Sequence, residues 1–425
     1  MGLLLDLGYA TVGLLASPVL LFKMASDRRY RHRLGERFGG APRRDGEKKC
    51  IWLHCASVGE VNVAKPLVRE LKKRHPEIEL NVSTTTMAGR ENAEKTWPGA
   101  RVHYWPFDFG FAVRRAIRRV RPDVIVLIEL EVWPNFVRIA ERKKIPIVIA
   151  NGRVSHRAFR RYRRLGWYFR SIFRRLPKVG AQSDGVAQRL VELGVPMANV
   201  TVTGNLKYDA ELAFDPVAAR SELRSLWGVK EDERLLVGGS THDPEETILV
   251  ETYLQLKAME PGLRLLIAPR HLERVSDVVE LITKAGLTLS RRSQPNPGGE
   301  VLLLDTVGEL AKTYAASDVV FIGGTFCARG GQNPLEPAAV GKPIVGGPSV
   351  ANFQEVVDEL AAAGGMRVLA EPADLAHAVL DFVRDPERAK ESGAKAKQVL
   401  ERGKGAVART MEVIEAVLSG PGPRA

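Results

Sequence analysis

The chain has 425 residues, of which 45% are hydrophobic and 27% are charged, and its formal net charge is +13. This length exceeds that of an average domain and the composition is that of a globular protein, so two folded domains are expected and extended disorder is excluded. Three cysteines provide no disulfide framework, which favours a reducing, cytoplasmic environment. The positive charge is local, because residues 23–49 carry +6 and residues 153–178 carry +10. This confinement argues against a uniformly cationic nucleic-acid binder and favours docking on an anionic surface.

The chain begins with an apolar stretch from Leu3 to Phe22 that only Asp6 interrupts. Twenty residues are close to the minimum for crossing a bilayer, and the basic residues follow the stretch rather than precede it. We therefore predict a membrane anchor or interfacial helix at 1–22, with a basic juxtamembrane segment at 23–47 that holds the protein on the cytoplasmic side. The alternative is an N-terminal helix buried against the domain.

Short runs rich in Val, Ile and Leu alternate with helical patterns along the rest of the chain, which predicts an α/β fold. The first run begins at Cys50. The further predicted strands are 78–84, 123–128, 146–150, 200–202, 234–238, 263–268, 301–304, 318–322 and 343–345. Two doubly wound, Rossmann-like halves follow from this order. The predicted boundaries are 48–210 for the first domain, 211–230 for a linker, 231–385 for the second domain and 386–425 for helices bracing both.

Unusual polar residues stand directly after these strands. The first run stops at Ala56-Ser57-Val58-Gly59-Glu60, which places Glu60 at the carboxyl end of a strand, where parallel sheets bind ligands. Ser57 and Glu60 also have the spacing of a capping box, in which the glutamate only satisfies a backbone N–H. Both interpretations of Glu60 stay open at this point. Glu129 and Glu131 follow a later strand in the same way.

The second basic segment, residues 153–178, interleaves six aromatic residues among nine arginines and contains no acid. Such a helix can place aromatic rings among lipid headgroups while its guanidinium groups meet phosphates. It could equally grip single-stranded nucleic acid, or be a solvated helix with a few core contacts. The mutual repulsion of ten cations favours an anionic partner.

The second half has a glycine-rich block from Gly323 to Pro348. Within it, Asn333, Pro334 and Glu336 read as an N-cap, a proline at the first helical position and an acid two residues later. Glu336 is either a capping residue or a ligand of a ribose. Upstream, Thr306 is predicted to cap a helix, with Gly308 allowing close approach of a ligand.

These motifs resemble the 3-deoxy-D-manno-octulosonic acid (Kdo) transferases of glycosyltransferase family 30. The resemblance runs nearly end to end. It rests on ASVGE at 56–60, STTT at 83–86, ELEVWPN at 129–135, IANGRVS at 149–155, TVTGNLKYD at 201–209, STHDPEE at 240–246, APRHLER at 268–274 and the block through Pro348. One departure is Gln332, which stands where the family usually has histidine.

The resemblance implies a GT-B fold and inverting transfer of Kdo from CMP-Kdo to a lipid A precursor, at the cytoplasmic face of the inner membrane. It implies Glu60 as the catalytic base, with no cofactor, no metal and no nucleic-acid partner. The implied donor-binding residues are Lys207, Ser240, Arg270, Thr306, Val307, Gly308, Asn333 and Glu336. The predicted acceptor-binding residues are Ser57, Gly59 and Glu131, to which the composition of the second basic segment adds Arg160, Arg161, Arg163 and Arg164.

Alternatives from other classes are a nucleotide-sugar epimerase with this fold, a transferase with another nucleotide donor, and a nucleic-acid-binding module. Lys207 could also be an ordinary surface cation. An epimerase would change the nucleotide sugar without an acceptor. A nucleic-acid module would leave the polar residues after the strands without a role.

Overall fold

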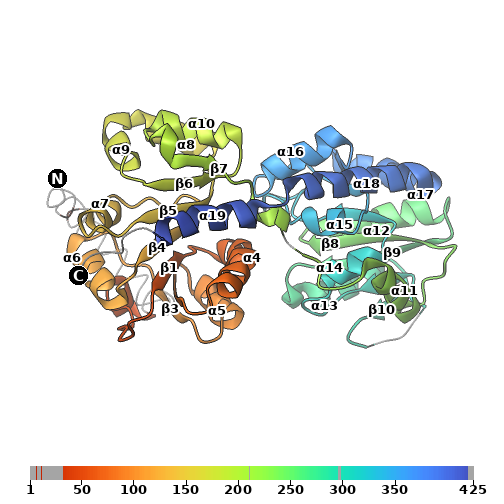
Figure 1. The fold of residues 1–425 in the computed structure, drawn as a ribbon. Coiled ribbons are helices and arrows are strands. Elements are labelled where there is room, and N and C mark those ends of the chain that lie inside the picture. Colours follow the sequence, from red (N-terminus) through yellow and green to blue (C-terminus); the bar gives the residue numbers. More distant parts are fainter. Residues whose placement is uncertain (1–5, 7–10, 12–31, 210, 295–297, 420–425) are drawn as a thin grey trace. The chain divides into compact units, whose positions relative to one another are not determined.

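The computed structural model describes Asp6, Thr11 and residues 32–209, 211–294 and 298–419. The chain divides into two compact units, residues 1–210 with 403–425, and residues 211–402. Among the described residues each unit contains one parallel sheet of seven strands (Figure 1). The α/β prediction is therefore confirmed for both halves.

The first unit has the strand order β3-β2-β1-β4-β5-β6-β7. Its strands are β1 (Cys50–His54), β2 (Glu79–Thr84), β3 (Arg101–Tyr104), β4 (Val124–Ile128), β5 (Ile147–Gly152), β6 (Lys178–Ala181) and β7 (Val200–Val202). Its helices are α3 (Leu34–Arg37), α4 (Val58–Arg74), α5 (Met87–Thr96), α6 (Gly110–Val120), α7 (Pro134–Arg142), α8 (His156–Arg164), α9 (Gly166–Phe173), α10 (Asp184–Leu193) and α19 (Ala406–Leu418), with 3-10 turns η1 (Met197–Asn199) and η2 (Leu206–Asp209).

The second unit has the order β10-β11-β9-β8-β12-β13-β14. Its strands are β8 (Arg234–Thr241), β9 (Leu263–Pro269), β10 (Leu289–Arg291), β11 (Val301–Leu303), β12 (Val319–Ile322), β13 (Ile344–Gly346) and β14 (Met366–Val368). Its helices are α11 (Pro216–Trp227), α12 (Glu245–Lys257), α13 (Val275–Lys284), α14 (Leu310–Thr313), α15 (Leu335–Ala339), α16 (Gln354–Ala363), α17 (Leu375–Arg384) and α18 (Pro386–Gly403), with 3-10 turns η3 (Leu272–Arg274), η4 (Tyr314–Ala316) and η5 (Pro372–Asp374).

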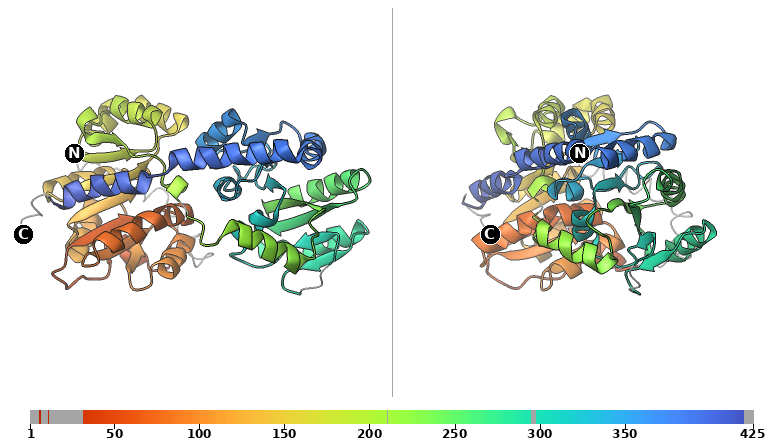
Figure 2. Two further views of the ribbon diagram at one scale, coloured as in Figure 1. Left: turned by 45° about the vertical axis from the view of Figure 1, so that its right-hand side comes forward. Right: turned by 90° about the vertical axis from the view of Figure 1, so that its right-hand side faces the viewer.

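Helices cover both faces of the first sheet, and its central strands β1, β4 and β5 are buried along their whole length (Figure 1). Trp52 and Ile125 pack into one apolar cluster, whereas Leu53 and Val126 pack into the other. Alternate residues of a strand point to opposite faces, which explains why these strands are apolar throughout. Helix α19, which returns from the end of the chain, contacts α4, β5 and β6 and runs along this unit (Figure 2).

Helix α4 shows how the local sequence positions Glu60. Ser57 is the N-cap, and its Oγ accepts a hydrogen bond from the Glu60 N–H at 3.4 Å. Val61, Ala64 and Leu67 follow at helical spacing and are buried against the sheet. The cap and the apolar stripe together fix the start of the helix next to the end of β1.

Several predicted boundaries differ from the structure. The described part of the basic segment at 23–47 belongs to the first unit, since Ala41 and Arg44 are buried and Arg44 pairs with Glu79 at 2.9 Å. The linker expected at 211–230 contains α11, whose Arg224 is buried in the second unit. The bracing helices separate, with α18 in the second unit and α19 in the first.

The anchor predicted at 1–22 lies outside the described residues, apart from Asp6 and Thr11. Asp6 Oδ1 accepts hydrogen bonds from the Gly110 N–H and from Asn135 Nδ2, both at 2.9 Å. In the described part of the chain, no helix combines the length and the apolar character needed to cross a bilayer.

Candidate active site

The glutamates predicted as site residues in the first half lie together beyond the carboxyl ends of two neighbouring strands. Strands β1 and β4 are parallel neighbours, with Ile51 paired to Val124, and the chain proceeds from this pair in opposite directions. This is the switch point where doubly wound sheets form a crevice beyond the carboxyl ends of the strands. Glu60 follows β1, and Glu129 and Glu131 follow β4.

Glu60 makes the capping contacts that its spacing allows. The Ala56 N–H donates to Glu60 Oε2 at 2.7 Å, and the Ser57 hydroxyl donates to Oε1 at 3.4 Å. Ser57, predicted to contact the acceptor, is engaged as the helix cap. Gly59 is exposed, and a Cβ there would meet only Ser57 Oγ within 4 Å. The Glu60 side chain keeps partial exposure, so capping does not seal it from ligands.

The pKa of Glu60 is raised from 4.5 to about 8, mainly by burial and also by the nearby charges of Glu129 and Glu131, while the hydrogen bonds from Ala56 and Ser57 oppose the rise. Burial also raises the pKa of Glu131, and the charge of Glu129 adds to this, while a hydrogen bond from Trp133 Nε1 at 3.0 Å opposes it. A pure capping glutamate is stabilised as a carboxylate, which lowers its pKa. The opposite direction at Glu60 is typical of a group placed for proton transfer.

Glu129 adopts a left-handed backbone conformation with φ of 60°. Such a conformation is uncommon for a side chain with a Cβ and is found at sites where the surrounding structure imposes it. The strained turn directs the chain from β4 towards Glu131 and α7.

The predicted basic helix is two helices, because the chain breaks at Leu165 between α8 and α9. Most of its aromatic rings face inward: Tyr162 packs edge-on against Phe169 with 4.8 Å between ring centroids, and Phe173 is buried. Trp167 is 74% exposed. The expectation that the aromatics together face a membrane is therefore wrong for these inward-facing rings, because they complete the core of the first unit.

The arginines of α8 keep their predicted exposure. We call Arg160, Arg161, Arg163 and Arg164 the α8 arginines. Tyr162 of this helix lies within electrostatic reach of Glu131: burial chiefly raises the pKa of the tyrosine, Arg161 lowers it, and the charge of Glu131 raises it slightly. A pocket of about 420 Å³ opens beside it. Its lining is Tyr162, Arg163, Gly166, Trp167, Phe169, Arg170, Glu192 and Leu193.

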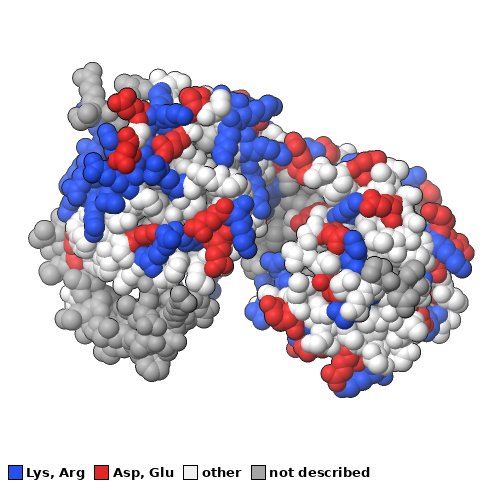
Figure 3. Space-filling model, turned by 90° about the horizontal axis from the view of Figure 1, so that it is seen from below, with Lys and Arg blue, Asp and Glu red and all other residues white. Residues whose placement is uncertain are grey.

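Basic side chains also gather elsewhere on the first unit. On the face drawn in Figure 3, Lys and Arg form a broad field over this unit, whereas on the second unit they alternate with Asp and Glu. On this face, the described surface of the first unit is therefore richer in cations than that of the second.

In the second unit, a buried carboxylate joins two strand exits. Glu245 accepts hydrogen bonds from the backbone N–H groups of His242, Gly324, Thr325 and Phe326, at 2.7 to 2.9 Å. It thereby ties the loop after β8 to the loop after β12, the neighbouring strand. Burial raises its pKa, while these bonds oppose the shift. The sequence reasoning missed this role, although the STHDPEE motif contains the residue.

The backbones of these two loops approach each other closely. Ser240, predicted to contact the donor, has φ of 54°. A Cβ at Gly323 would lie 2.3 Å from the Ser240 carbonyl oxygen, so only glycine fits there. Ser240 therefore lies at a strained strand exit next to the glycine-rich block.

Three of the predicted donor residues lie near one another. Arg270 directly follows β9, and Asn333 and Glu336 lie at the start of α15. Asn333 Oδ1 accepts a hydrogen bond from the Leu335 N–H at 3.1 Å, and its Nδ2 donates to Glu336 Oε1 at 3.1 Å. The N-cap of α15 is Pro334, so the predicted cap is wrong by one residue, and Asn333 holds the turn that precedes the helix. Burial raises the pKa of Glu336, and the charge of Arg270, which is exposed, lowers it. Arg270 and Glu336 therefore lie within electrostatic reach of each other.

The loop from Thr306 to Gly308 follows β11 on the same edge of the sheet. Thr306 does not cap α14 as predicted, because its hydroxyl donates to Glu309. Val307 is 83% exposed, and Gly308 has φ of 91° with open space where a Cβ would be. The loop is accessible to a ligand.

Gln332, the departure from the family pattern, contacts His242, with 3.2 Å between Gln332 Nε2 and His242 Nε2. An amide there donates to the unprotonated imidazole nitrogen. The pKa of His242 is lowered to about 4, first by burial and then by His271 and nearby arginines, so the imidazole is neutral near pH 7. The sequence places His242 among the polar residues that follow a strand but predicts no role for it.

Lys207 belongs to the first unit, whereas the other predicted donor residues belong to the second. It lies in η2 of the first unit, partly buried, and its N–H donates to Asn205 Oδ1 at 3.1 Å. The described residues contain no cluster of three His, Cys, Asp or Glu side chains arranged to hold a metal ion.

Comparison with known proteins identifies the family. A Kdo transferase of Haemophilus influenzae is 33% identical to this chain over 424 residues, covering 96% of this chain and 98% of that protein. The chain belongs to the 3-deoxy-D-manno-octulosonic acid transferases. A Kdo transferase of Bordetella pertussis is 32% identical over 86% of each chain. The family model described as 3-deoxy-D-manno-octulosonic-acid transferase (kdotransferase) matches residues 32–210. The chain is therefore a glycosyltransferase.

Solved structures of other enzymes share the fold. A glycosyltransferase from Rickettsia africae aligns with a TM-score of 0.58, at 13% identity, over 88% of this chain and all of that chain. A UDP-GlcNAc 2-epimerase from Neisseria meningitidis aligns with the same TM-score at 14% identity, over 88% of this chain and all of that chain. At this identity the likeness shows the fold alone.

Proposed function

We propose that the chain transfers Kdo from CMP-Kdo to a hydroxyl of an anionic lipid A precursor in lipopolysaccharide biosynthesis, with inversion at the anomeric carbon. Membership of the Kdo transferase family supports the donor and the sugar. The observation that carries the chemistry is Glu60, a partly exposed carboxyl at a sheet switch point whose pKa is raised to about 8.

In this reaction the acceptor oxygen forms a bond to the anomeric carbon while the bond from that carbon to the phosphate oxygen breaks. The proton of the hydroxyl goes to the Glu60 carboxylate, and CMP leaves with the electron pair of the broken bond. A base whose pKa lies near the working pH is the most effective at such a transfer, and the surroundings of Glu60 supply that value. Glu131 lies within electrostatic reach of both Glu60 and Tyr162. Glu131 and Tyr162 would therefore orient the acceptor beside the base.

The second unit would hold the CMP part of the donor. Arg270 supplies a positive charge for the departing phosphate, and Asn333 and Glu336 supply polar groups for the ribose or phosphate. Thr306, Val307 and Gly308 form an accessible loop on the same edge. Ser240 would contact the donor from the strained exit of β8. Lys207 would contribute a cation from the first unit.

We further propose that the protein works at the cytoplasmic face of the inner membrane. The α8 arginines and the basic field of the first unit provide charge for an anionic headgroup. The apolar run in residues 1–22 would add an anchor or an interfacial helix. Deletion of residues 1–22 should then release protein from membranes, unless the basic surface suffices by itself.

Transfer is proposed to need no metal ion and no cofactor, because an arginine and backbone N–H groups can balance the charge of the leaving phosphate. Addition of a chelator should leave the rate unchanged. Loss of activity with a chelator, restored by one divalent ion, would overturn this part of the proposal.

Product analysis tests the whole proposal. Purified protein is incubated with CMP-Kdo and a tetra-acylated lipid A precursor, and the lipid and nucleotide products are separated by chromatography and mass spectrometry. The expected result is a lipid heavier by one or more Kdo residues, with release of CMP that depends on the lipid. A changed nucleotide sugar without acceptor would instead indicate an epimerase, and nucleotide release only with another donor would reject CMP-Kdo.

A further inference from the structure

A polar cavity lies in the second unit at the amino ends of the strands. The proposed donor site lies at their carboxyl ends. Its volume is about 390 Å³. Its lining is Arg220, Arg234, Asp318, Gly341, Lys342, Pro343, Phe382, Pro386, Ala389 and Lys390. Arg234 opens β8, Asp318 precedes β12 and Pro343 precedes β13, all parallel neighbours, so the cavity lies where strands begin. We call it the cation pocket.

Three cations of the cation pocket have no acidic partner. Among the described residues, no carboxylate lies within salt-bridge distance of Arg234, Lys342 or Lys390. Arg234 is partly buried, Lys390 is exposed at the start of α18, and Lys342 Nζ donates to the Ser317 carbonyl at 2.6 Å. Cations gathered without a counter-charge repel one another, and a bound anion relieves this repulsion.

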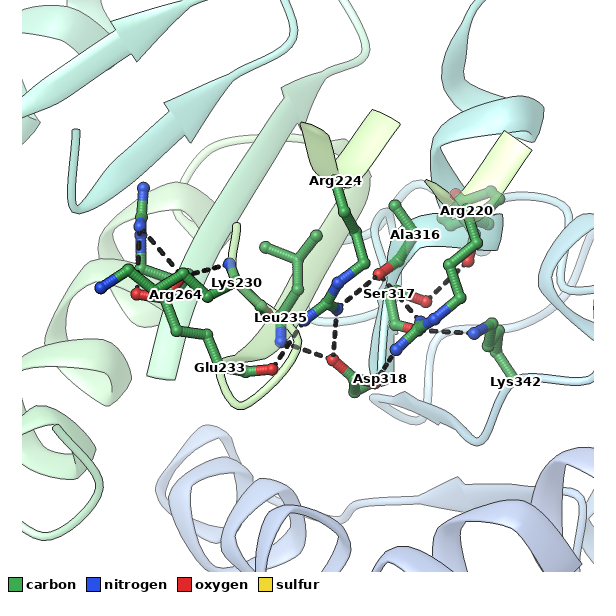
Figure 4. Close-up of polar contacts among 11 residues, drawn as sticks. Arg220, Arg224, Lys230, Glu233, Leu235, Arg264, Ala316, Ser317, Asp318 and Lys342 are labelled. Carbon is green, nitrogen blue, oxygen red and sulfur yellow. Dashed lines mark hydrogen bonds and ion pairs between the residues drawn. The ribbon is translucent and has the colours of Figure 1, made fainter. Parts of the chain in front are cut away.

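The one acid of the pocket is already engaged, as Figure 4 shows. Asp318 Oδ1 accepts from Arg220 at 2.9 Å, and Oδ2 accepts from Arg224 at 3.1 Å and from the Leu235 N–H at 2.9 Å. Burial favours the neutral acid, yet the pKa of Asp318 lies below its usual value because of Arg220 and Arg224. Asp318 is therefore a carboxylate paired with two arginines, and its charge compensates Lys342 only in part.

The turn that carries Lys342 is held in place by close packing. Gly341 has φ of 69°, and a Cβ on Gly393 of α18 would lie 2.0 Å from the Gly341 carbonyl oxygen. Helix α18 thus closes directly onto the turn and brings Lys390 to the pocket. Burial and then the charge of Arg220 lower the pKa of Lys342 to about 8. The charge of Asp318 opposes this shift but does not overcome it.

The size and the walls of the cation pocket indicate a small organic anion. Pockets for small molecules span roughly 300 to 1,000 Å³ and combine apolar walls with a few polar groups. Pro343, Phe382 and Pro386 provide apolar walls here, and a guanidinium beside two ammonium groups suits a phosphate with several oxygens. We propose that Arg234, Lys342 and Lys390 bind a small phosphorylated anion at a site separate from the proposed donor site.

The test uses the full chain and sodium diphosphate as the probe. Lysines are labelled with trace acetic anhydride at pH 8, with diphosphate or with sodium chloride of equal ionic strength, and the labelling of each lysine is measured by peptide mass spectrometry. A bound anion that raises the pKa of Lys342 from about 8 by one unit lowers its reactive amine fraction about fivefold at pH 8. Lys284, which pairs with Glu280 on α13, is the internal control and should not change.

Matched variants assign the effect to the pocket. R234Q/K390Q should lose the protection of Lys342 by diphosphate, and K390Q alone, at an exposed position, should weaken it. K395Q/K397Q removes two cations from α18 outside the pocket lining and should keep full protection. Equal labelling of Lys342 in diphosphate and chloride, or unchanged protection in R234Q/K390Q, would overturn the proposal.

Titration calorimetry gives a second measurement that does not depend on the reactivity of Lys342. Both double variants retain any phosphate site at the other edge of the sheet, so their difference reports the cation pocket. K395Q/K397Q should bind one diphosphate more than R234Q/K390Q. Identical isotherms would reject the pocket as an anion site, and neither outcome depends on whether the chain transfers Kdo.

Discussion

Replacing Glu60 with glutamine should abolish turnover and, at the same time, make the first unit more stable above pH 7. Glutamine is nearly isosteric with glutamate, and its carbonyl oxygen can still accept the hydrogen bond that the Ala56 N–H donates to Glu60. The substitution therefore keeps the helix cap and removes the ionisable group. It also removes the cost of placing a negative charge near Glu129 and Glu131.

The size of the effect follows from the pKa. A rise from 4.5 to about 8 corresponds to about 5 kcal/mol at about 1.36 kcal/mol per pH unit, and remaining solvent contact reduces this to about 2 to 4 kcal/mol. Glu60 in the unfolded chain ionises near pH 4.5, whereas in the folded chain it ionises near pH 8. Between these values the folded state holds more protons, so the free energy of unfolding falls as the pH rises from 4.5 to 8. E60Q has no ionisable group at this position, so its free energy of unfolding does not fall for this reason as the pH rises.

The assay compares wild type and E60Q at pH 5 and pH 8.5. Hydrogen exchange of peptides from β1 and α4 measures the opening free energy of this unit separately from the other unit. The two proteins should be similar at pH 5, and E60Q should be better protected at pH 8.5. Turnover of CMP-Kdo with a lipid acceptor is measured in parallel, and wild-type kcat/KM should rise with pH towards about pH 8. E70Q, which removes an acid from the same helix, is the control and should keep wild-type turnover.

Two results would refute this reasoning. If E60Q retains turnover, Glu60 is not the base. If wild type and E60Q show the same pH dependence of protection, the Glu60 carboxyl is not perturbed in the folded protein, and its role is limited to capping α4.

Glu131→Gln should lower the pKa of Glu60 by removing a like charge and move the acidic limb of the kcat/KM profile to lower pH; an unmoved limb would mean that Glu131 is distant from the base. Changing the α8 arginines to glutamine should weaken binding to anionic vesicles at least about tenfold, since each surface cation contributes roughly 1 kcal/mol, and unchanged cosedimentation would assign membrane binding to other residues. Arg270→Lys should raise KM for CMP-Kdo about tenfold through loss of bidentate phosphate contact, as measured by initial rates, and an unchanged KM would place the phosphate elsewhere. Glu245→Ala leaves four buried N–H groups without their acceptor and should lower the free energy of unfolding of the second unit by about 3 kcal/mol in urea titrations, whereas a change below about 1 kcal/mol would show that the loops rearrange.

Much of the fold could be predicted from local pattern. The ten strands expected from runs of Val, Ile and Leu are all present. Most of them are buried on both faces, which requires an apolar strand along its whole length, whereas β7 is an exposed edge strand. The missed strands are β3, β6, β10 and β14. Of these, β3, β10 and β14 are sheet edges with polar residues such as Arg101 and Arg367, and β6 is short and built from small residues. Their pairing depends on the neighbouring strand more than on their own composition.

The candidate site shows the same division. The sequence by itself determined that Glu60, Glu129 and Glu131 follow strands, because the end of an apolar run is a local property. Only the tertiary structure decided that β1 and β4 are neighbours, which brings the three carboxyl groups within electrostatic reach and raises the pKa of Glu60. Likewise, the glutamates after β8 were visible in the sequence, but Glu245 acquires three of its four donors only when β12 pairs beside β8. Strand order is set by packing between distant segments, and the pKa depends on burial and distance, so neither can be read from spacing along the chain.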